Sequence, residues 1–316
     1  MPTRFVTQSL IAGIATLALA LAGCSSGNND NASTATAAVS GATTAAAPSA
    51  TGAQHHGTIH LVYVEWDSCV AGTDLVKGAL EQAGYTVKTT SVTAAMMFEG
   101  VANGDADAMV CAWLPTTHKA YYARTKDQLV NVGANLDGGA TIGLVVPDYV
   151  TIKSIADLAK PEVAKKMDNR IIGIDPGAGE MELTQKVISH YKLPEKLIDG
   201  SDATMTAELG NEIRQHKWVV VTGWNPHWMW SRWHLRYLQD PDGIYGKPES
   251  IYTLVRKGLK QKHPYAFAVL SRYRRTLADT DAIMDAANRP GNSIEKAADA
   301  WLKAHPQQVA QWLGNG

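Results

Sequence analysis

Three tryptophans stand at the same point of the sequence pattern, directly after a short apolar run that predicts a β-strand. They are Trp66, Trp113 and Trp224, in the segments VEWDS, CAWLP and TGWNPHW. Ligands of open α/β sheets bind beyond the carboxyl ends of the strands, so we expect the three indoles to meet in one crevice. Aromatic faces attract a cation that has no N–H to donate, and each ring contributes about 0.5–2 kcal/mol. The pattern predicts a cage for a quaternary ammonium group; ordinary packing of each Trp is the alternative.

A glycine-rich segment supplies groups of the opposite polarity. Residues 177–180 (GAGE) lie between a predicted strand and a predicted helix. Amides at a helix N-terminus carry a partial positive charge, and glycine lets a ligand approach them closely. We expect the backbone N–H groups of Gly179 and Glu180 to bind a carboxylate, with the Glu180 side chain turned away from it. His118, which follows Trp113 closely, would add a ring donor. The alternatives are a simple tight turn and an unremarkable surface histidine.

The elements that would position these residues alternate between strands and helices. In a first unit the pattern predicts strands over 59–64, 85–90, 108–112 and 142–146 and helices over 71–83 and 94–102. In a second unit it predicts a short helix over 154–158, strands over 171–174 and 218–222 and a helix over 181–191. The chain then returns to the first unit at 252–254, and helices follow within 263–313. This order predicts an α/β fold of mainly parallel sheets flanked by helices. We expect one lobe from residues 58–147 with 252–316, and a second lobe from residues 148–251.

The first residues have the features of an export signal. Arg4 precedes the apolar run 10–22, which is too short for a stable membrane span. Small residues then precede Cys24, as in the lipobox of bacterial lipoproteins. We expect residues 1–23 to be a signal peptide, Cys24 to be lipidated, and residues 24–57, which hold almost no large apolar side chain, to form a flexible tether. A plain secretory signal and a transmembrane anchor are the alternatives.

Two cysteines remain beside Cys24. Cys69 follows the first predicted strand and Cys111 closes a later one. An even pair in an oxidising compartment suggests a disulfide, and neighbouring strand ends lie close enough for one. The alternative is a pair of small buried thiols.

The composition excludes several classes of function. Lys and Arg number 29 against 30 Asp and Glu, so there is no basic excess with which to bind nucleic acid. The chain has no Ser–His–Asp signature, no HExxH helix and no GxxxxGK loop, and its histidines lack the spacing of metal ligands. We expect no enzymatic activity, no cofactor and no metal. A carbohydrate stacked on Trp and a purely structural surface lipoprotein are the remaining alternatives.

Five motifs carry a resemblance to a known family. They are YVEWDS (63–68), AWLPTTH (112–118), GLVVPDY (143–149), IIGIDPGAGEM (171–181) and TGWNPHWMW (222–230). Over nearly all of residues 58–316 the chain resembles the glycine betaine/proline betaine-binding proteins of ABC importers. The resemblance implies a two-lobed periplasmic-binding-protein fold. Some relatives carry the two lobes in the opposite order along the chain.

The resemblance also implies roles for the residues of the site. The three tryptophans would surround a trimethylammonium group, while the amides of Gly179 and Glu180 and the ring of His118 would hold a carboxylate. The implied partners are a small zwitterion, an ABC permease and its ATPase. We expect a monomeric receptor, lipid-anchored to the extracytoplasmic face of the cell membrane through Cys24, that captures its ligand by closure of the two lobes.

Overall fold

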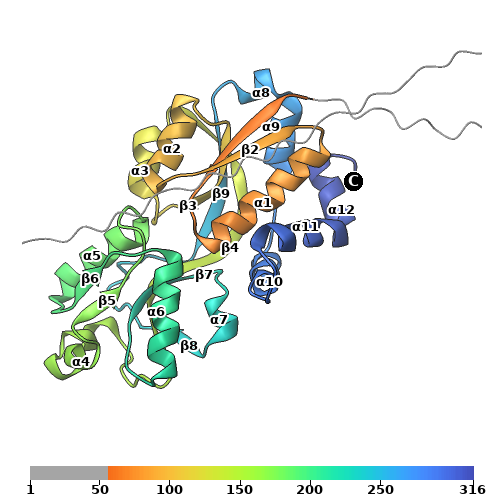
Figure 1. Ribbon diagram of the computed structural model, residues 1–316. Coiled ribbons are helices and arrows are strands. Elements are labelled where there is room, and N and C mark those ends of the chain that lie inside the picture. The colour runs from red at the N-terminus through yellow and green to blue at the C-terminus, as the bar shows by residue number, and fades with distance from the viewer. Residues whose placement is uncertain (1–55) are drawn as a thin grey trace, which may run out of the picture. The chain divides into compact units, whose positions relative to one another are not determined.

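The computed structural model describes residues 56–316, so the predicted signal peptide, the lipidation site and all but the end of the tether lie outside the described residues. The strands follow one order, β2-β1-β3-β9-β4-β7-β5-β6, with β8 paired to β4. β4 (Leu129–Pro147) belongs to both halves of this order, because its first part pairs with β9 and its last part with β7 and β8. We call the half around β1, β3 and β9 the first lobe and the half around β5 and β7 the second lobe (Figure 1). The boundaries given above stay a prediction.

The first lobe combines the N-terminal βαβαβ unit with the C-terminal helices. Its elements besides β4 are β1 (Thr58–Tyr63), α1 (Asp67–Gln82), β2 (Thr86–Ser91), α2 (Ala94–Asn103), β3 (Ala108–Leu114), α3 (Lys119–Thr125), β9 (Glu249–Arg256), α8 (Leu259–Lys262), α9 (Pro264–Arg272), α10 (Leu277–Ala287), α11 (Ile294–Ala304) and α12 (Pro306–Leu313). β1 is parallel to β2 and β3, whereas β9 is antiparallel to β3 and β4. Figure 1 shows α2 and α3 on one side of this sheet and α1 with α11 on the other.

Burial of apolar stripes explains the packing of these helices. In α1 the side chains of Leu75, Val76, Ala79 and Leu80 are fully buried, which is the spacing of one helix face. At the C-terminus the indoles of Trp301 and Trp312 stack with their centroids 5.7 Å apart. The sequence-based expectations that this stretch is helical and that residues 252–254 return to the first sheet are confirmed.

The second lobe is smaller. Its elements besides β4 are a 3₁₀ helix η1 (Ile155–Ala159), α4 (Pro161–Lys166), β5 (Arg170–Ile172), α5 (Gly179–Tyr191), β6 (Lys196–Ile198), α6 (Asp202–Arg214), β7 (Val221–Asn225), α7 (Met229–Arg232) and β8 (Leu235–Tyr237). β5 is parallel to β6 and β7, whereas β7 and β8 are antiparallel to β4. Ser201 and Thr204 cap the start of α6 reciprocally, which fixes the position of Asp202 in its first turn.

Some element boundaries differ from the sequence-based prediction in ways that matter for the site. β3 and β7 run on through Trp113 and Trp224, so these two indoles project from the ends of strands rather than follow them. α1 begins directly after Trp66, four residues earlier than the apolar spacing predicts. β4 extends thirteen residues further towards the N-terminus than the predicted strand 142–146, because β9 pairs with this Gly- and Asn-rich stretch through several register shifts.

Two ties hold the first turn of α1 against β3. Cys69 and Cys111 form a disulfide with their Cα atoms 5.4 Å apart. The buried guanidinium of Arg275 donates to the carbonyl of Ser68 at 3.1 Å and to the side-chain oxygen of Asn135 at 3.3 Å. The Asn135 amide in turn donates to the β3 backbone. Both ties lie within a few residues of a pocket-forming tryptophan.

None of the described helices combines the length and the apolar composition that a membrane crossing requires.

Candidate ligand-binding site

One pocket lies between the two lobes and contains every binding residue that the sequence predicts. Its lining residues are Trp66, Ser68, Trp113, Thr117, His118, Ile142, Ile174, Ala178, Gly179, Glu180 and Trp224. The first lobe supplies the residues up to His118 and the second lobe those from Ile174 onwards. A ligand in this pocket would therefore contact both lobes.

The three indoles are buried at the pocket wall. Trp66, Trp113 and Trp224 expose only 6%, 5% and 4% of their surface. Trp66 is the N-cap residue of α1, and its Nε1 donates to the carboxylate of Asp175 at 3.0 Å in the second lobe. The edge of His227 meets the Trp224 ring at a centroid distance of 4.7 Å and an interplanar angle of 89°. The polar edge of Trp66 is thus satisfied outside the pocket, which leaves its apolar face for a ligand.

His118 presents an unsatisfied donor. Its Nδ1 accepts a hydrogen bond from the backbone N–H of Trp113 at 3.0 Å, so the ring proton belongs on Nε2. Nε2 is buried and has no hydrogen-bond partner among the described residues. Burial lowers the pKa of His118 to about 3, so the ring is neutral at ordinary pH. A buried N–H without a partner costs about 1–3 kcal/mol, and an acceptor on a ligand would remove that cost.

The turn that carries His118 is held by a residue that the sequence analysis missed. The buried carboxylate of Glu249, at the start of β9, accepts hydrogen bonds from the backbone N–H groups of Thr116 and Thr117 and from the Thr117 hydroxyl. Glu249 is 131 residues away in sequence from His118. No local pattern links the two, and only the pairing of β9 with β3 brings them together.

The start of α5 faces the pocket from the second lobe. α5 begins at Gly179 without a side-chain cap from Ala178. The first amides of a helix have no intrahelical acceptor, and they carry the positive end of the helix dipole. The N–H groups of Gly179 and Glu180 thus have no acceptor within the helix, and their binding of an anion stays a prediction.

The side chain of Glu180 is engaged by the strand behind the helix. Its Oε1 accepts a hydrogen bond from the N–H of Gly223 at 2.8 Å, next to Trp224. Burial raises the pKa of this carboxyl well above its usual value, against the opposing effect of the Gly223 hydrogen bond. The nearby carboxylate of Asp202 adds to the rise. Burial of Glu180 thus favours its neutral form over its ionised form.

The two lobes touch at the rim of the pocket. The hydroxyl of Tyr121 donates to the carbonyl of Gly177 at 2.7 Å. The Cα of Gly179 lies so close to the Thr117 carbonyl that an added Cβ would overlap its oxygen. Glycine at 179 therefore serves the approach of the two backbones.

This fold and this pocket define a class of protein. An α/β protein with two lobes and a ligand pocket between them has the architecture of periplasmic binding proteins. Residues 57–304 match the family described as the substrate binding domain of ABC-type glycine betaine transport system. The chain belongs to this family.

Individual relatives agree with the family assignment. The glycine betaine/carnitine transport binding protein GbuC of Listeria monocytogenes is 40% identical over 157 residues, which cover 49% of this chain and 52% of that protein. The match thus spans about half the length of that relative. The glycine betaine/proline betaine-binding periplasmic protein of Escherichia coli is 27% identical over 278 residues, 76% of this chain and 84% of that protein.

Solved structures show the same fold. Lactococcal OpuAC, in its closed-liganded conformation with glycine betaine, superposes with a TM-score of 0.77 and 41% identity over 81% of this chain and 99% of that chain. An ABC-transporter choline binding protein in complex with choline has a TM-score of 0.76 and 26% identity, over 81% of this chain and 91% of that one.

The contact between Gly179 and Thr117 predicts the effect of one methyl group. Gly179→Ala should leave each lobe folded but keep the two backbones apart, and overpacking of this kind costs about 1–3 kcal/mol. We expect about ten- to hundredfold weaker ligand binding in titration calorimetry of the full chain. Gly100→Ala is the matched control, because an added Cβ there meets nothing within 4 Å. Equal affinities of the two variants would contradict the role given to Gly179.

The protonation of His118 predicts a constant contribution to binding. Because its pKa is lowered to about 3, the Nε2 donor is fully present at pH 5 and at pH 8. His118→Ala should weaken binding by about tenfold, equivalent to about 1.4 kcal/mol, and by the same factor at both pH values. The ratio of wild-type to variant affinity is the quantity to measure, since it cancels any pH effect that arises elsewhere. A ratio that changes severalfold would show that the ring titrates.

Proposed function

We propose that this protein captures a small zwitterion of the glycine betaine type between its lobes and delivers it to an ABC importer. The observation that carries the proposal is the buried Nε2–H of His118, without a partner among the described residues, in a pocket walled by three indoles. Further support comes from the family and from the lactococcal structure with glycine betaine.

The cationic end of such a ligand matches the indoles. A quaternary ammonium group has a permanent charge and no hydrogen to donate, so a carboxylate could form no hydrogen bond with it. The faces of Trp66, Trp113 and Trp224 attract it through their quadrupoles at little cost in desolvation. In our proposal these three rings form the cage.

The anionic end matches the remaining polar groups of the pocket. A carboxylate can accept from the N–H groups of Gly179 and Glu180 at the start of α5 and from Nε2 of His118. These donors come from both lobes, so the ligand completes hydrogen bonds that neither lobe completes alone. Binding then favours the closed state.

The cellular setting follows from the same proposal. Lipidation of Cys24 would hold the protein at the extracytoplasmic face of the membrane, and residues 24–57 would give it reach towards the permease. The proposal includes a monomeric receptor without a cofactor or catalytic activity. Accumulation of the solute would serve osmotic protection.

Choline is the second candidate ligand, because one structural neighbour is a choline binding protein in complex with choline. Choline has the trimethylammonium group and lacks the carboxylate. It would leave the donors of His118 and α5 unpaired, and a neutral Glu180 would offer no counter-charge. We therefore favour the zwitterion over choline, and over a carbohydrate stacked on Trp.

Calorimetry with glycine betaine, choline and glycine tests the ligand class. We expect the full chain to bind glycine betaine, and choline and glycine at least about tenfold more weakly, because each lacks one of the two recognised groups. Trp113→Ala should weaken glycine betaine binding by tenfold or more, about 1.4 kcal/mol, from the loss of one cage ring. Trp218→Ala is the control, since this Trp packs under Lys166 at 4.4 Å outside the pocket. Tight binding of choline would contradict the proposed carboxylate site. If none of the three compounds binds, the proposed ligand class is wrong.

Glu180→Gln tests whether the pocket is free of ionised side chains. Gln keeps the shape of the side chain and still accepts the hydrogen bond from Gly223. If Glu180 is neutral in wild type, the variant should therefore bind glycine betaine with an affinity within about threefold of wild type. Glu182→Gln, at an exposed position of α5 paired with Lys186, is the matched control. An ionised Glu180 would instead repel the ligand carboxylate, and its removal would strengthen glycine betaine binding and weaken choline binding.

A further inference from the structure

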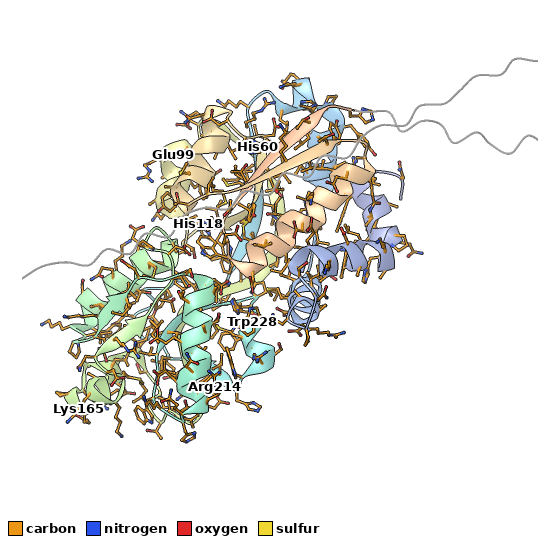
Figure 2. All side chains as sticks on the ribbon, in the orientation of Figure 1. His60, Glu99, His118, Lys165, Arg214 and Trp228 are labelled. Atoms are coloured by element: carbon orange, nitrogen blue, oxygen red, sulfur yellow. A yellow bond between two sulfur atoms is a disulfide. The ribbon has the colours of Figure 1, made fainter. Side chains whose placement is uncertain are left out.

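A second polar cluster joins the lobes outside the ligand pocket. The backbone N–H of Asp67, in the first turn of α1, donates to Asp202 Oδ2 at 3.1 Å. The indole Nε1 of Trp228 donates to Asp67 Oδ2 at 2.6 Å, and His227 Nε2 lies 2.9 Å from Asp202 Oδ1. Asp67 belongs to the first lobe and the other three residues to the second. Figure 2 shows Trp228 where the elements of the two lobes meet.

The histidine of this cluster supplies no positive charge. His227 Nδ1 accepts a hydrogen bond from the backbone N–H of Met229 at 3.0 Å, so this nitrogen carries no proton. The single ring proton then lies on Nε2 and is donated to Asp202. The same bonds argue against a metal ion, although Asp67, Asp202 and His227 bring one potential ligand atom each within 4.8 Å of one another. A metal on Nε2 would require a proton on Nδ1, facing the Met229 N–H.

The surroundings do not neutralise the two carboxyl groups. Glu65 lies two residues before Asp67 in sequence and, like Asp202, disfavours its ionisation, whereas the Trp228 hydrogen bond, and a charge on His227, would favour it. From α10, Asp281 faces His227 and is itself close to Asp285. Arg214 and Arg232 line the groove beside the cluster, but neither forms an ion pair with Asp67 or Asp202 in the described part of the chain. Among the described residues, no Lys or Arg side chain pairs with either carboxyl group when the lobes close.

We propose that Asp67, Asp202, His227 and Trp228 form a proton-bound latch, which holds the lobes closed more tightly when the Asp67 carboxyl group is protonated. In the open protein the two carboxyl groups separate, and the Asp67 carboxyl group returns to water and ionises. In the closed protein one bound proton removes the repulsion between them, while the hydrogen bonds from Trp228 and His227 remain. The latch acts on ligand affinity only through closure, so its effect on affinity rests on the function proposed above.

The sign of the pH dependence follows from this difference. Burial, and then the charge of Asp202, raise the pKa of Asp67 to about 6 in the closed protein, against an ordinary value near 3.8. A group whose pKa is raised in one state stabilises that state at low pH, and the gain is lost as the pH rises through the raised value. Affinity should fall as the pH rises from about 4 to about 6, and then level off.

The test compares wild type with Asp67→Asn in the full chain. The Asn side chain still accepts from Trp228 but needs no proton, so we expect glycine betaine binding at pH 7.5 to be about tenfold tighter than in wild type. The variant should also have a flat affinity profile between pH 4.5 and 7.5. A merely structural role for Asp67 predicts weaker binding instead.

A ligand-free measurement separates the latch from the proposed ligand. The indole N–H resonance of Trp228, assigned with Trp228→Phe, should titrate in wild type with a midpoint between the ordinary Asp67 value near 3.8, which applies to the open protein, and the value of about 6 in the closed protein. It should stay unchanged in Asp67→Asn. If no betaine binds at any pH but this titration is seen, the ligand assignment fails and the latch stands. If the resonance does not titrate, or titrates equally in Asp67→Asn, the latch is wrong.

Asp74→Asn is the matched control. Asp74 lies further along α1, and burial raises its pKa to about 6 as well, but its charged neighbours are Lys77, Glu81, Glu295 and Asp299 of the first lobe. We expect it to leave affinity and the Trp228 resonance as in wild type. An increase in affinity equal to that of Asp67→Asn would show that general relief of negative charge, and not the latch, is responsible.

Discussion

In the proposed function, the need to bind two opposite charges without water governs the design of this pocket. A carboxylate and a quaternary ammonium group both lose their hydration when the lobes close, and an ionised side chain beside one end would repel the other. The pocket meets this constraint with partners that carry no net charge, namely indole faces, helix N-terminal amides and a neutral imidazole. Burial of Glu180, which raises the pKa of its carboxyl group and favours the neutral form, fits the same solution. Each of these partners presents a partial charge of the suitable sign to one end of the ligand. No ionised side chain of the protein has to lose its hydration when the ligand binds.

Such weak individual partners require accurate placement, and the fold provides it from remote segments. Glu249 on β9 holds the turn before His118, while Arg275 and the Cys69–Cys111 disulfide hold the start of α1 against β3. These supports bind residues within and beside the lining, such as Ser68 and Thr117, and none of them binds an indole ring directly. A displacement of an indole or an N–H by about 1 Å would lose much of a short-range interaction, so the supports are as necessary as the lining.

The sequence predicts the pocket better than it predicts the elements around it. Trp66, Trp113, Trp224, His118, Gly179 and Glu180 stand within compact motifs, and the periodicity of an α/β chain is enough to place those motifs at one edge of the sheets. The long β4 was missed because its Gly- and Asn-rich half has low strand propensity and forms only through pairing with β9. Glu249 was missed because its role depends on contacts with residues 132 and 133 positions away in the sequence. Asp202 was missed for the same reason, since its carboxylate matters only when α6 meets α1.

The two contacts between the lobes differ in their electrostatics, and this difference gives them separate tasks. In our proposal the ligand pocket has a neutral lining, so its affinity responds to the groups of the ligand and little to pH. The cluster around Asp67 and Asp202 holds two acids with no paired cation in the described part of the chain, so closure there responds to pH and not to the ligand's identity. Because both contacts open and close with the same movement, their free energies add in the closed state. Selectivity can thus be set in the pocket while the stability of the closed state is set beside it, without a single residue having to serve both.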